Sequence, residues 1–370
     1  MPAPVSRDQS NARNDPMSRP ARATATFASA QQALAPRPRS MPANIGAGGY
    51  RAGHGSVRKC LLDSGRPLVI VNPRSGGGMS ESRWARVRGA LADGLGELDS
   101  AFTTGPRDAT EIARREAAGG RRLILALGGD GTISEVADGV LAAGAGATTE
   151  IGLIPRGTGG DFRRTIEVPH EIAAAAEHIK NAPARAIDAG RVRYRATDGG
   201  EGVRHFVNVA SFGFSSAVAR RANASSKRFG GRIAFMGATL RELFAHENHD
   251  VWLTVDGQER KRRRVMMAAV GNGRFFGGGM KICPDALIDD GAFDLVAVGD
   301  LTRGQVVANI GKLFGGTHLE LEQVTHERIT RLHAEPVESD ADIAVELDGE
   351  TPGHLPATFE IVPGALRLRA

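Results

Sequence analysis

Three glycine-rich loops are the part of this sequence best suited to chemistry on phosphate groups. They cover residues 72–78, 128–132 and 156–161, and each directly follows a short run of apolar residues. Such runs suit strands buried on both faces of a parallel sheet, and the loops that follow parallel strands form a binding crevice at one edge of the sheet. Because glycine has no Cβ, these loops can turn sharply and approach a ligand closely. We therefore expect the three loops to meet in one phosphate-binding crevice.

Asp130 lies in the second loop, within the sequence Gly-Gly-Asp-Gly-Thr, and a helix is predicted directly after it. The free N–H groups of a helix N-terminus attract anions. A carboxylate at this point repels phosphate unless a metal ion intervenes, so the pattern indicates phosphoryl transfer with Mg²⁺. Thr132 and Glu135 have the spacing of a capping box, which predicts that they cap this helix. The alternative is an aspartate that only caps its own turn.

The order of the apolar runs predicts two folded domains. Residues 66–185 alternate strands with helices, which indicates a doubly wound α/β domain with a parallel sheet. Residues 186–370 hold short strands with Gly and Asp turns, interrupted by helices near 229–245 and 302–315, and this indicates an antiparallel β-sandwich. The last strands of the second domain could return to the first. The predicted fold class is thus α/β plus all-β.

Composition limits the remaining possibilities. The chain has 370 residues, of which 41% are hydrophobic and 24% charged, as expected for a largely globular protein. Its two cysteines, Cys60 and Cys283, give no disulfide framework, so we expect a reducing compartment. No apolar run approaches the roughly 18 residues of a membrane helix. We also find no pattern of a secretory signal.

The first segment of the chain, residues 1–65, is predicted to be a disordered basic tail. Residues 1–60 hold eight Arg and one Lys against two Asp, a net charge of +7, whereas the whole chain carries +5 and the rest therefore −2. The tail is rich in Ala, Pro, Ser and Gly and has no periodic apolar pattern. A basic tail can contact anionic lipid or nucleic acid. A solvated extension and an organellar transit peptide are the alternatives.

Six motifs occur in an order that resembles one known family. They are N-P-x-S-G-G, G-G-D-G-T, G-T-x-x-D-F, G-N-x-x-x-x-G-G-G, P-x-A-x-x-x-D-G and L-D-G-E, at residues 72–77, 128–132, 157–162, 271–279, 284–291 and 347–350. Together they resemble the diacylglycerol kinase catalytic-domain family, which includes bacterial lipid kinases and the sphingosine and ceramide kinases. The resemblance begins near Pro67 and omits the tail. It implies a first domain similar to those of the NAD kinase and phosphofructokinase group.

The resemblance also implies roles for individual residues. Positions that match nucleotide contacts of the bacterial members, together with neighbouring loop residues, give an expected ATP site of Asn72, Thr103, Gly128, Gly129, Asp130, Gly131, Thr132, Ile133, Ser134, Gly157, Thr158 and Asp161. Asp290 matches a Mg²⁺ ligand, with backbone carbonyls from Leu287 and Ala292. Glu350 matches the residue usually assigned as proton acceptor. Asp130 would orient the phosphoryl group or Mg²⁺ and could share the role of base.

One position departs from the family pattern. The third loop usually carries Asn before its Asp, whereas this chain has Gly160. The departure removes a side-chain amide that could order the loop or bind nucleotide. Thr158 and Asp161 remain on either side of it, so the difference concerns a detail of nucleotide binding.

These observations predict an ATP- and Mg²⁺-dependent kinase of phospholipid biosynthesis that converts diacylglycerol to phosphatidic acid. We expect it in the cytoplasm, in peripheral contact with the inner face of the membrane and with no nucleic-acid partner; a homodimer is possible. The alternatives are a ceramide- or sphingosine-type kinase, an NAD-kinase-like enzyme with a soluble substrate, and a non-catalytic nucleotide- or lipid-binding regulator. A nucleotide-binding oxidoreductase is disfavoured because no G-x-G-x-x-G opens the first strand–helix unit.

Overall fold

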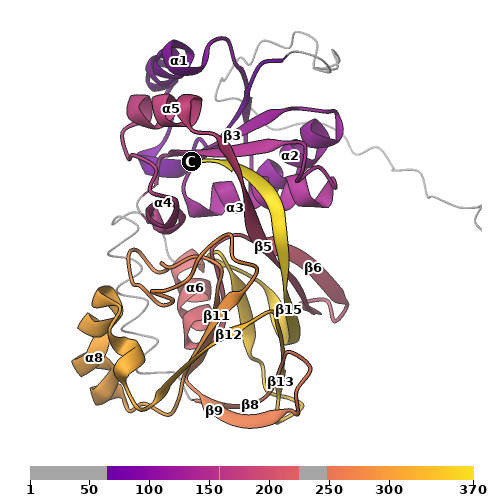
Figure 1. The fold of residues 1–370 in the computed structure, drawn as a ribbon, viewed down its shortest axis with the longest axis vertical. Helices are drawn as coiled ribbons and strands as arrows, with labels where there is room; N and C mark the ends of the chain where they lie inside the picture. Colours follow the sequence, from indigo (N-terminus) through magenta and orange to yellow (C-terminus); the bar gives the residue numbers. More distant parts are fainter. Residues whose placement is uncertain (1–64, 158, 225–247) are drawn as a thin grey trace, which may run out of the picture. The chain divides into compact units, whose positions relative to one another are not determined.

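The computed structural model describes residues 65–157, 159–224 and 248–370 (Figure 1). The predicted basic tail, Cys60, Thr158 and the helix predicted near 229–245 lie outside the described residues. Within the described ranges, no helix is long and apolar enough to cross a membrane.

The first lobe is a parallel α/β sheet, as predicted. Its strands stand in the order β2-β1-β3-β4, and all neighbours pair in parallel. Helices α1 and α5 pack together through Gly94 and Ala176, while α2 and α3 pack together through Gly139 and Thr110. These two helix pairs cover different sides of the strands (Figure 1). The elements are β1 Leu68–Val71, α1 Glu81–Leu95, β2 Asp99–Phe102, α2 Asp108–Ala118, β3 Leu123–Gly128, α3 Asp130–Ala142, β4 Glu150–Pro155, α4 Asp161–Ile166 and α5 Ile172–Asn181.

Burial explains why these runs form strands. All four residues of β1 are buried, as are the last five of β3 and of β4. An apolar run without alternation suits a strand covered by helices on both faces. The three glycine loops follow β1, β3 and β4, and they therefore lie at the same edge of the sheet.

The capping box predicted at the start of α3 is wrong. The helix begins at Asp130, its N-cap is the extended residue Gly129, and no side chain caps it. The Thr132 hydroxyl instead accepts a hydrogen bond from the Asn72 side-chain amide at 3.2 Å. The Glu135 carboxylate accepts one from the backbone amide of Ala109 in α2 at 3.1 Å. Tertiary partners thus replace the local pair.

The second lobe is a β-sandwich with two antiparallel layers. One layer has the order β12-β11-β10-β7-β14, and the other runs β9-β8-β13-β15-β5-β6. Their bounds are β5 Ala184–Ala196, β6 Glu201–Phe206, β7 Val209–Gly213, β8 His249–Val255, β9 Lys261–Val265, β10 Met267–Gly271, β11 Phe293–Val298, β12 Val324–Ile329, β13 Arg331–Pro336, β14 Ala344–Leu347 and β15 Glu350–Arg369.

Aromatic side chains from both layers fill the sandwich core. Phe206 stacks on Phe293 with ring centroids 5.5 Å apart, and Phe212 contacts Phe359 at 6.3 Å. All four rings are fully buried. Each pair joins one layer to the other, because β6 and β15 belong to one layer and β7 and β11 to the other. Aromatic pairs of this kind supply much of the energy that holds such layers together.

Strand β15 connects the two lobes (Figure 1). Its first residues pair with β14, and its middle pairs with β13 and β5. Near the chain end it pairs in parallel with β4, with Arg367 opposite Glu150 and Leu368 opposite Ile151. The C-terminal residues therefore extend the first sheet as a fifth strand.

Helices α6 (Phe214–Ala224) and α8 (Arg303–Gly315) and the short η3 (His318–Glu320) complete the second lobe. Phe214 and Val218 of α6 pack with Met266 and Met267 beside β10 in a third apolar cluster. Partly buried residues of α8, among them Val306 and Leu313, contact the same cluster.

Candidate functional site

The three glycine loops are bound to one another. The amide of Arg156 donates to the carbonyl of Gly128 at 2.6 Å, and the Ser75 hydroxyl donates to the carbonyl of Arg156. A Cβ at Gly157 would lie 2.8 Å from the Cα of Gly129, so only glycine allows this approach. The structure therefore brings the loop residues expected at the ATP site together in one place, with Thr158 outside the described residues.

The residues of the expected ATP site differ in whether they can offer a side chain or only the backbone to a nucleotide. Thr103 directly follows β2, beside β1, and its amide donates to the carbonyl of Val71 at 2.9 Å. Ile133 is fully buried in the core of the first lobe, so it can offer only its backbone to a nucleotide. Gly129 and Gly131 have no side chain, and backbone amides at a helix N-terminus are groups well suited to phosphate.

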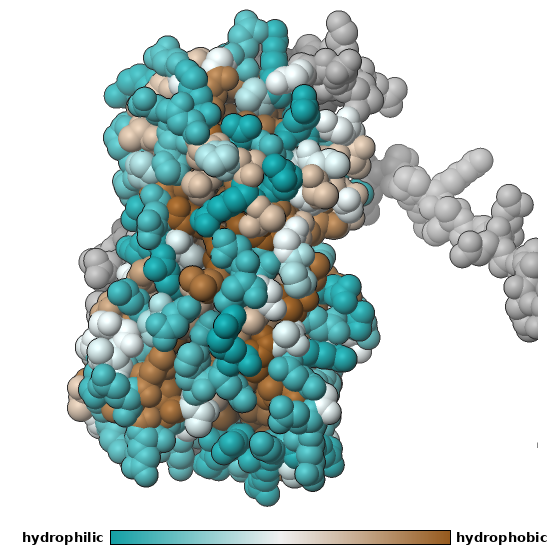
Figure 2. Space-filling model, in the orientation of Figure 1, coloured by the Kyte–Doolittle hydropathy of each residue, from teal (hydrophilic) through white to brown (hydrophobic). Residues whose placement is uncertain are grey.

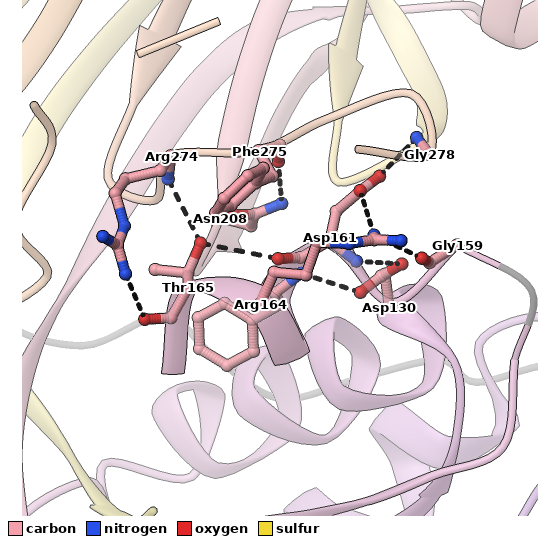
Figure 3. Close-up of polar contacts among 10 residues, drawn as sticks. Asp130, Gly159, Asp161, Arg164, Thr165, Asn208, Arg274, Phe275 and Gly278 are labelled. Carbon is pink, nitrogen blue, oxygen red and sulfur yellow. Dashed lines mark hydrogen bonds and ion pairs between the residues drawn. The ribbon is translucent and has the colours of Figure 1, made fainter. Parts of the chain in front are cut away.

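Asp130 bridges the second loop to helix α4. Its two carboxylate oxygens accept hydrogen bonds from the amides of Phe162 and Asp161, at 2.9 and 3.1 Å (Figure 3). These are orphan donors of the first turn of α4. Asp130 therefore holds the second and third loops in a fixed relation, in addition to any contact with a ligand.

Asp161 is the first residue of α4 and is buried beside Asp130. Its carboxylate pairs with Arg164 at 2.9 Å and accepts the amide of Gly278 at 2.7 Å (Figure 3). Burial, together with the nearby charge of Asp130, raises the pKa of Asp161 to about 6. Gly278 belongs to the G-N-x-x-x-x-G-G-G motif, so this contact joins the second lobe to the third loop.

The backbone at Gly160 accounts for the departure from the family pattern. Gly160 is the N-cap of α4 and has φ +65° and ψ +39°, a left-handed conformation. Among residues with a side chain, Asn is one of the few that adopt this conformation readily. Glycine therefore satisfies the same backbone requirement as the usual Asn, and the change removes only the side-chain amide.

Asp348 ties the two lobes together at the turn between β14 and β15. Its carboxylate accepts the backbone amides of Val207, Asn208 and Val209, at 3.0, 3.1 and 3.0 Å. The hydroxyl of Ser134 in α3 also bonds to it, although burial still raises its pKa to about 6. Sequence reasoning used this motif only for Glu350 and missed Asp348. A signal was present, since Asp-Gly suits the left-handed turn seen here.

Glu346 is a second acid that sequence reasoning missed. It lies in β14, whose four residues are all buried. Its carboxylate accepts the Ser211 hydroxyl and, at 2.6 Å, the amide of Gly349. Burial raises the pKa of Glu346 to about 7, and the charges of Asp348 and Asp161 contribute to the rise. One charged residue in the apolar strand Ala-Val-Glu-Leu was the signal available in the sequence.

Glu350, the expected proton acceptor, lies in a different polar cluster. Its carboxylate pairs with Arg204 at 2.9 Å, and its side chain is 34% exposed. Arg204 also approaches Asp138 of α3, at 3.8 Å, and Asp138 pairs with Arg107 at 2.8 Å. Among the described residues, the cavity described below is lined by Gly349 and not by Glu350.

The residues expected at a Mg²⁺ site lie on the turn before β11. The Asp290 carboxylate accepts the amide of Ala292 at 3.2 Å and pairs with Arg328. The side chain of Leu287 is exposed. Asp188 supports this turn, because one of its oxygens accepts the amide of Gly291 at 2.7 Å.

Asp130 and Asp161 also form an arrangement that fits Mg²⁺. A Cβ added at Gly159 would lie 2.8 Å from an oxygen of Asp130 and 3.9 Å from one of Asp161. Two carboxylates that repel each other beside amides suited to phosphate would suit a cation that takes its other ligands from phosphate and water. The described residues contain no group of three or more His, Cys, Asp or Glu side chains that could hold a metal by themselves.

A cavity of about 340 Å³ opens beside these acids. Four carboxylates line it, those of Asp130, Asp161, Glu346 and Asp348. The rest of the wall is mainly apolar and comes from α6, the β10 region and α8, with Phe214, Val218, Met266, Met267, Met280, Val306, Ile310 and Leu313 among its residues. An apolar cavity with a few convergent polar groups is the usual form of a small-molecule site.

Comparisons with known proteins agree with this architecture. Residues 66–192 match the family model of the diacylglycerol kinase catalytic domain, and residues 208–370 match that of the YegS C-terminal NAD kinase beta sandwich-like domain. A Mycobacterium tuberculosis protein named diacylglycerol kinase is 30% identical over 82% of this chain and 94% of its own length. A Pseudomonas aeruginosa protein named "Probable lipid kinase YegS-like" is 30% identical over 83% of this chain and 95% of its own length.

A solved structure gives the same result. The crystal structure of a diacylglycerol kinase from Bacillus anthracis aligns with a TM-score of 0.62 and 25% identity, over 82% of this chain and 96% of that one. The chain belongs to the bacterial diacylglycerol kinase family and, as a member of it, is a lipid kinase phosphotransferase. The family predicted from the six motifs is confirmed.

The buried acids predict a pH dependence of stability. Glu346 has an ordinary pKa of 4.5 when unfolded and about 7 in the folded protein. Between these values the folded state binds more protons, so the free energy of unfolding falls as pH rises from about 4.5 to 7. Glu346→Gln should remove roughly 2–3 kcal/mol of that fall, measured by urea unfolding at several pH values. Glu327→Gln, which changes an exposed residue of β12, is the control and should leave the pH dependence of the free energy of unfolding unchanged. The same pH dependence in both variants would contradict the assignment.

Proposed function

We propose that this protein transfers the γ-phosphoryl group of ATP to the hydroxyl of diacylglycerol, giving phosphatidic acid, and that it requires Mg²⁺. One observation carries the proposal: glycine loops suited to phosphate and an apolar cavity suited to acyl chains meet at a common group of carboxylates. The apolar wall favours a lipid acceptor over a soluble one.

On the nucleotide side, this chain supplies positioning and charge. The amides of the loop at residues 128–132 would bind phosphate oxygens, helped by the dipole of α3. Asp130 and Asp161 would hold Mg²⁺, which supplies neutralisation of phosphate charge when it is bound. The turn that carries Leu287, Asp290 and Ala292 remains a second proposed Mg²⁺ site, by family resemblance.

On the acceptor side, a carboxylate must accept the proton of the attacking hydroxyl. By family resemblance we assign this role to Glu350, with Asp130 able to share it. Glu350 begins β15 directly after Gly349, which lines the cavity. Its carboxylate pairs with Arg204 at 2.9 Å, which fixes the position of the side chain at the start of the strand.

Helix α8 offers a surface for peripheral contact with the inner face of a membrane. None of its residues is buried. Val306, Ile310 and Leu313 line the cavity. Val307, Ile310 and Phe314 are exposed by 55, 38 and 45%. The helix also carries Arg303 and Lys312 and no acid, a charge suited to anionic lipid.

The hydropathy of the molecular surface is the background for this proposed contact. Figure 2 shows that the visible face is mostly hydrophilic, with separate apolar patches. A lipid that leaves the bilayer beside α8 would reach the cavity past the same helix, because the helix forms part of the cavity wall.

Phosphate transfer from γ-labelled ATP to lipids in mixed micelles tests the reaction. We expect label in phosphatidic acid when Mg²⁺ and diacylglycerol are present, and a loss of at least about 100-fold in Asp130→Asn and Glu350→Gln. Glu327→Gln should retain full activity. Label in NAD, in ceramide or in sphingosine would overturn the choice of acceptor. ATP binding without transfer to any acceptor would overturn the proposed reaction.

Sedimentation with vesicles that contain phosphatidylglycerol tests the membrane surface. Val307→Asp and Phe314→Asp should each weaken vesicle binding about tenfold, since each removes one large apolar contact. Activity on a short-chain diacylglycerol in solution should persist, because neither side chain lines the cavity. Val203→Asp is the matched control, an equally exposed valine on β6. Unchanged vesicle binding in both α8 variants would exclude this helix as the contact.

A further inference from the structure

The cavity contains a polar group that the proposed roles leave unused. Glu346 lies on the sandwich side of the cavity, in buried strand β14, and Ser215 of α6 lies beside it on the cavity wall. Ser211 of β7 connects the two: it bonds to Glu346, and the Ser215 hydroxyl lies 2.8 Å from it. All three residues are buried.

When Glu346 is ionised, the hydrogen bonds in this group assign every hydroxyl proton. A hydroxyl has one proton to donate. The proton of Ser215 goes to Ser211, and the proton of Ser211 goes to Glu346. The amide of Gly349 donates to the other carboxylate oxygen at 2.6 Å. What remains on Glu346 and Ser215 is therefore a set of lone pairs, which can only accept hydrogen bonds.

Neighbouring acids offer these remaining lone pairs no further donor. Asp348 and Asp161 are acids, and they already accept backbone amides. Asn208 also lines the cavity, and within the described part of the chain its buried Oδ1 has no hydrogen-bond partner. The polar part of the cavity is thus rich in acceptors, in a wall that is otherwise apolar. Buried acceptors without a donor are costly, so this place favours a ligand that brings one.

We propose that Glu346 and Ser215 form the site that binds the free hydroxyl of the acceptor lipid before transfer, with its O–H donated to one of them, and that they distinguish a lipid alcohol from a fully esterified lipid. This inference rests on the proposed function and deepens it. The acyl chains would occupy the apolar wall, while the hydroxyl would lie near Asp130 and Asp161. A lipid without that hydroxyl would leave the remaining lone pairs of Glu346 and Ser215 without a donor, which is how sites of this kind reject an analogue.

Lipid binding without ATP tests the inference separately from catalysis. The two probes are sn-1,2-dioctanoylglycerol and 1,2-dioctanoyloxypropane, which has the same chains and lacks the hydroxyl. At a pH above the raised pKa of Glu346, the wild-type protein should prefer the alcohol by about tenfold or more, as expected for a hydrogen bond to a charged acceptor. Glu346→Leu should bring the ratio close to one, Glu346→Gln should give an intermediate ratio, and Ser215→Ala should lower it a few-fold. Glu327→Gln should keep the wild-type ratio.

The ratio of the affinities for the two probes separates recognition from folding, because misfolding would weaken the binding of both lipids alike. In the transfer reaction, Glu346→Leu should raise the KM for diacylglycerol and leave the KM for ATP unchanged. A wild-type preference for the alcohol without phosphate transfer would support the inference while the proposed function fails. The inference would be overturned if the wild type bound both probes equally or bound neither. It would also be overturned if folded Glu346→Leu kept the full preference for the alcohol.

Discussion

The buried carboxylate of Asp348 is the contact on which the site depends. It accepts three consecutive backbone amides from residues 207–209 of the second lobe and bonds to Ser134 of α3 in the first. Removing the carboxylate would leave those amides buried without partners, at a cost of about 1–3 kcal/mol for each unsatisfied group. Its position fixes the turn between β14 and β15, and that turn places Glu346, Gly349 and Glu350. The acid is thus structural, although it lies among residues suited to chemistry.

Charge is concentrated where the two lobes meet. Asp130, Asp161, Glu346 and Asp348 share one cavity, and burial raises the pKa values of the last three. The charge of Asp130 adds to the rise at Asp161, and the charges of Asp348 and Asp161 add to the rise at Glu346. Such an arrangement is unfavourable in the empty protein and becomes favourable when cations and hydrogen-bond donors enter. Mg²⁺ on the side of the glycine loops and a lipid hydroxyl on the side of the sandwich meet these two requirements.

The sequence predicted those parts of the structure that local patterns determine. The apolar runs before the three glycine loops form β1, β3 and β4, and the loops meet at one edge of the sheet. The capping box at Thr132 and Glu135 failed because Asn72 and Ala109, distant in sequence, bind these side chains. Glu346 was missed because its partner Ser211 lies on another strand. The long path of β15 was only partly visible, since pairing with four strands in turn is a property of the whole fold.

A crystal structure with Mg²⁺, a non-hydrolysable ATP analogue and dioctanoylglycerol tests the central claim most directly. The account predicts phosphates on the amides of residues 128–132, acyl chains between α6 and α8, and the lipid hydroxyl within about 3.5 Å of the γ-phosphorus. That hydroxyl should also lie within hydrogen-bond distance of Glu346 or Ser215 in the complex. A nucleotide bound away from these loops, or acyl chains outside the cavity, would contradict the account.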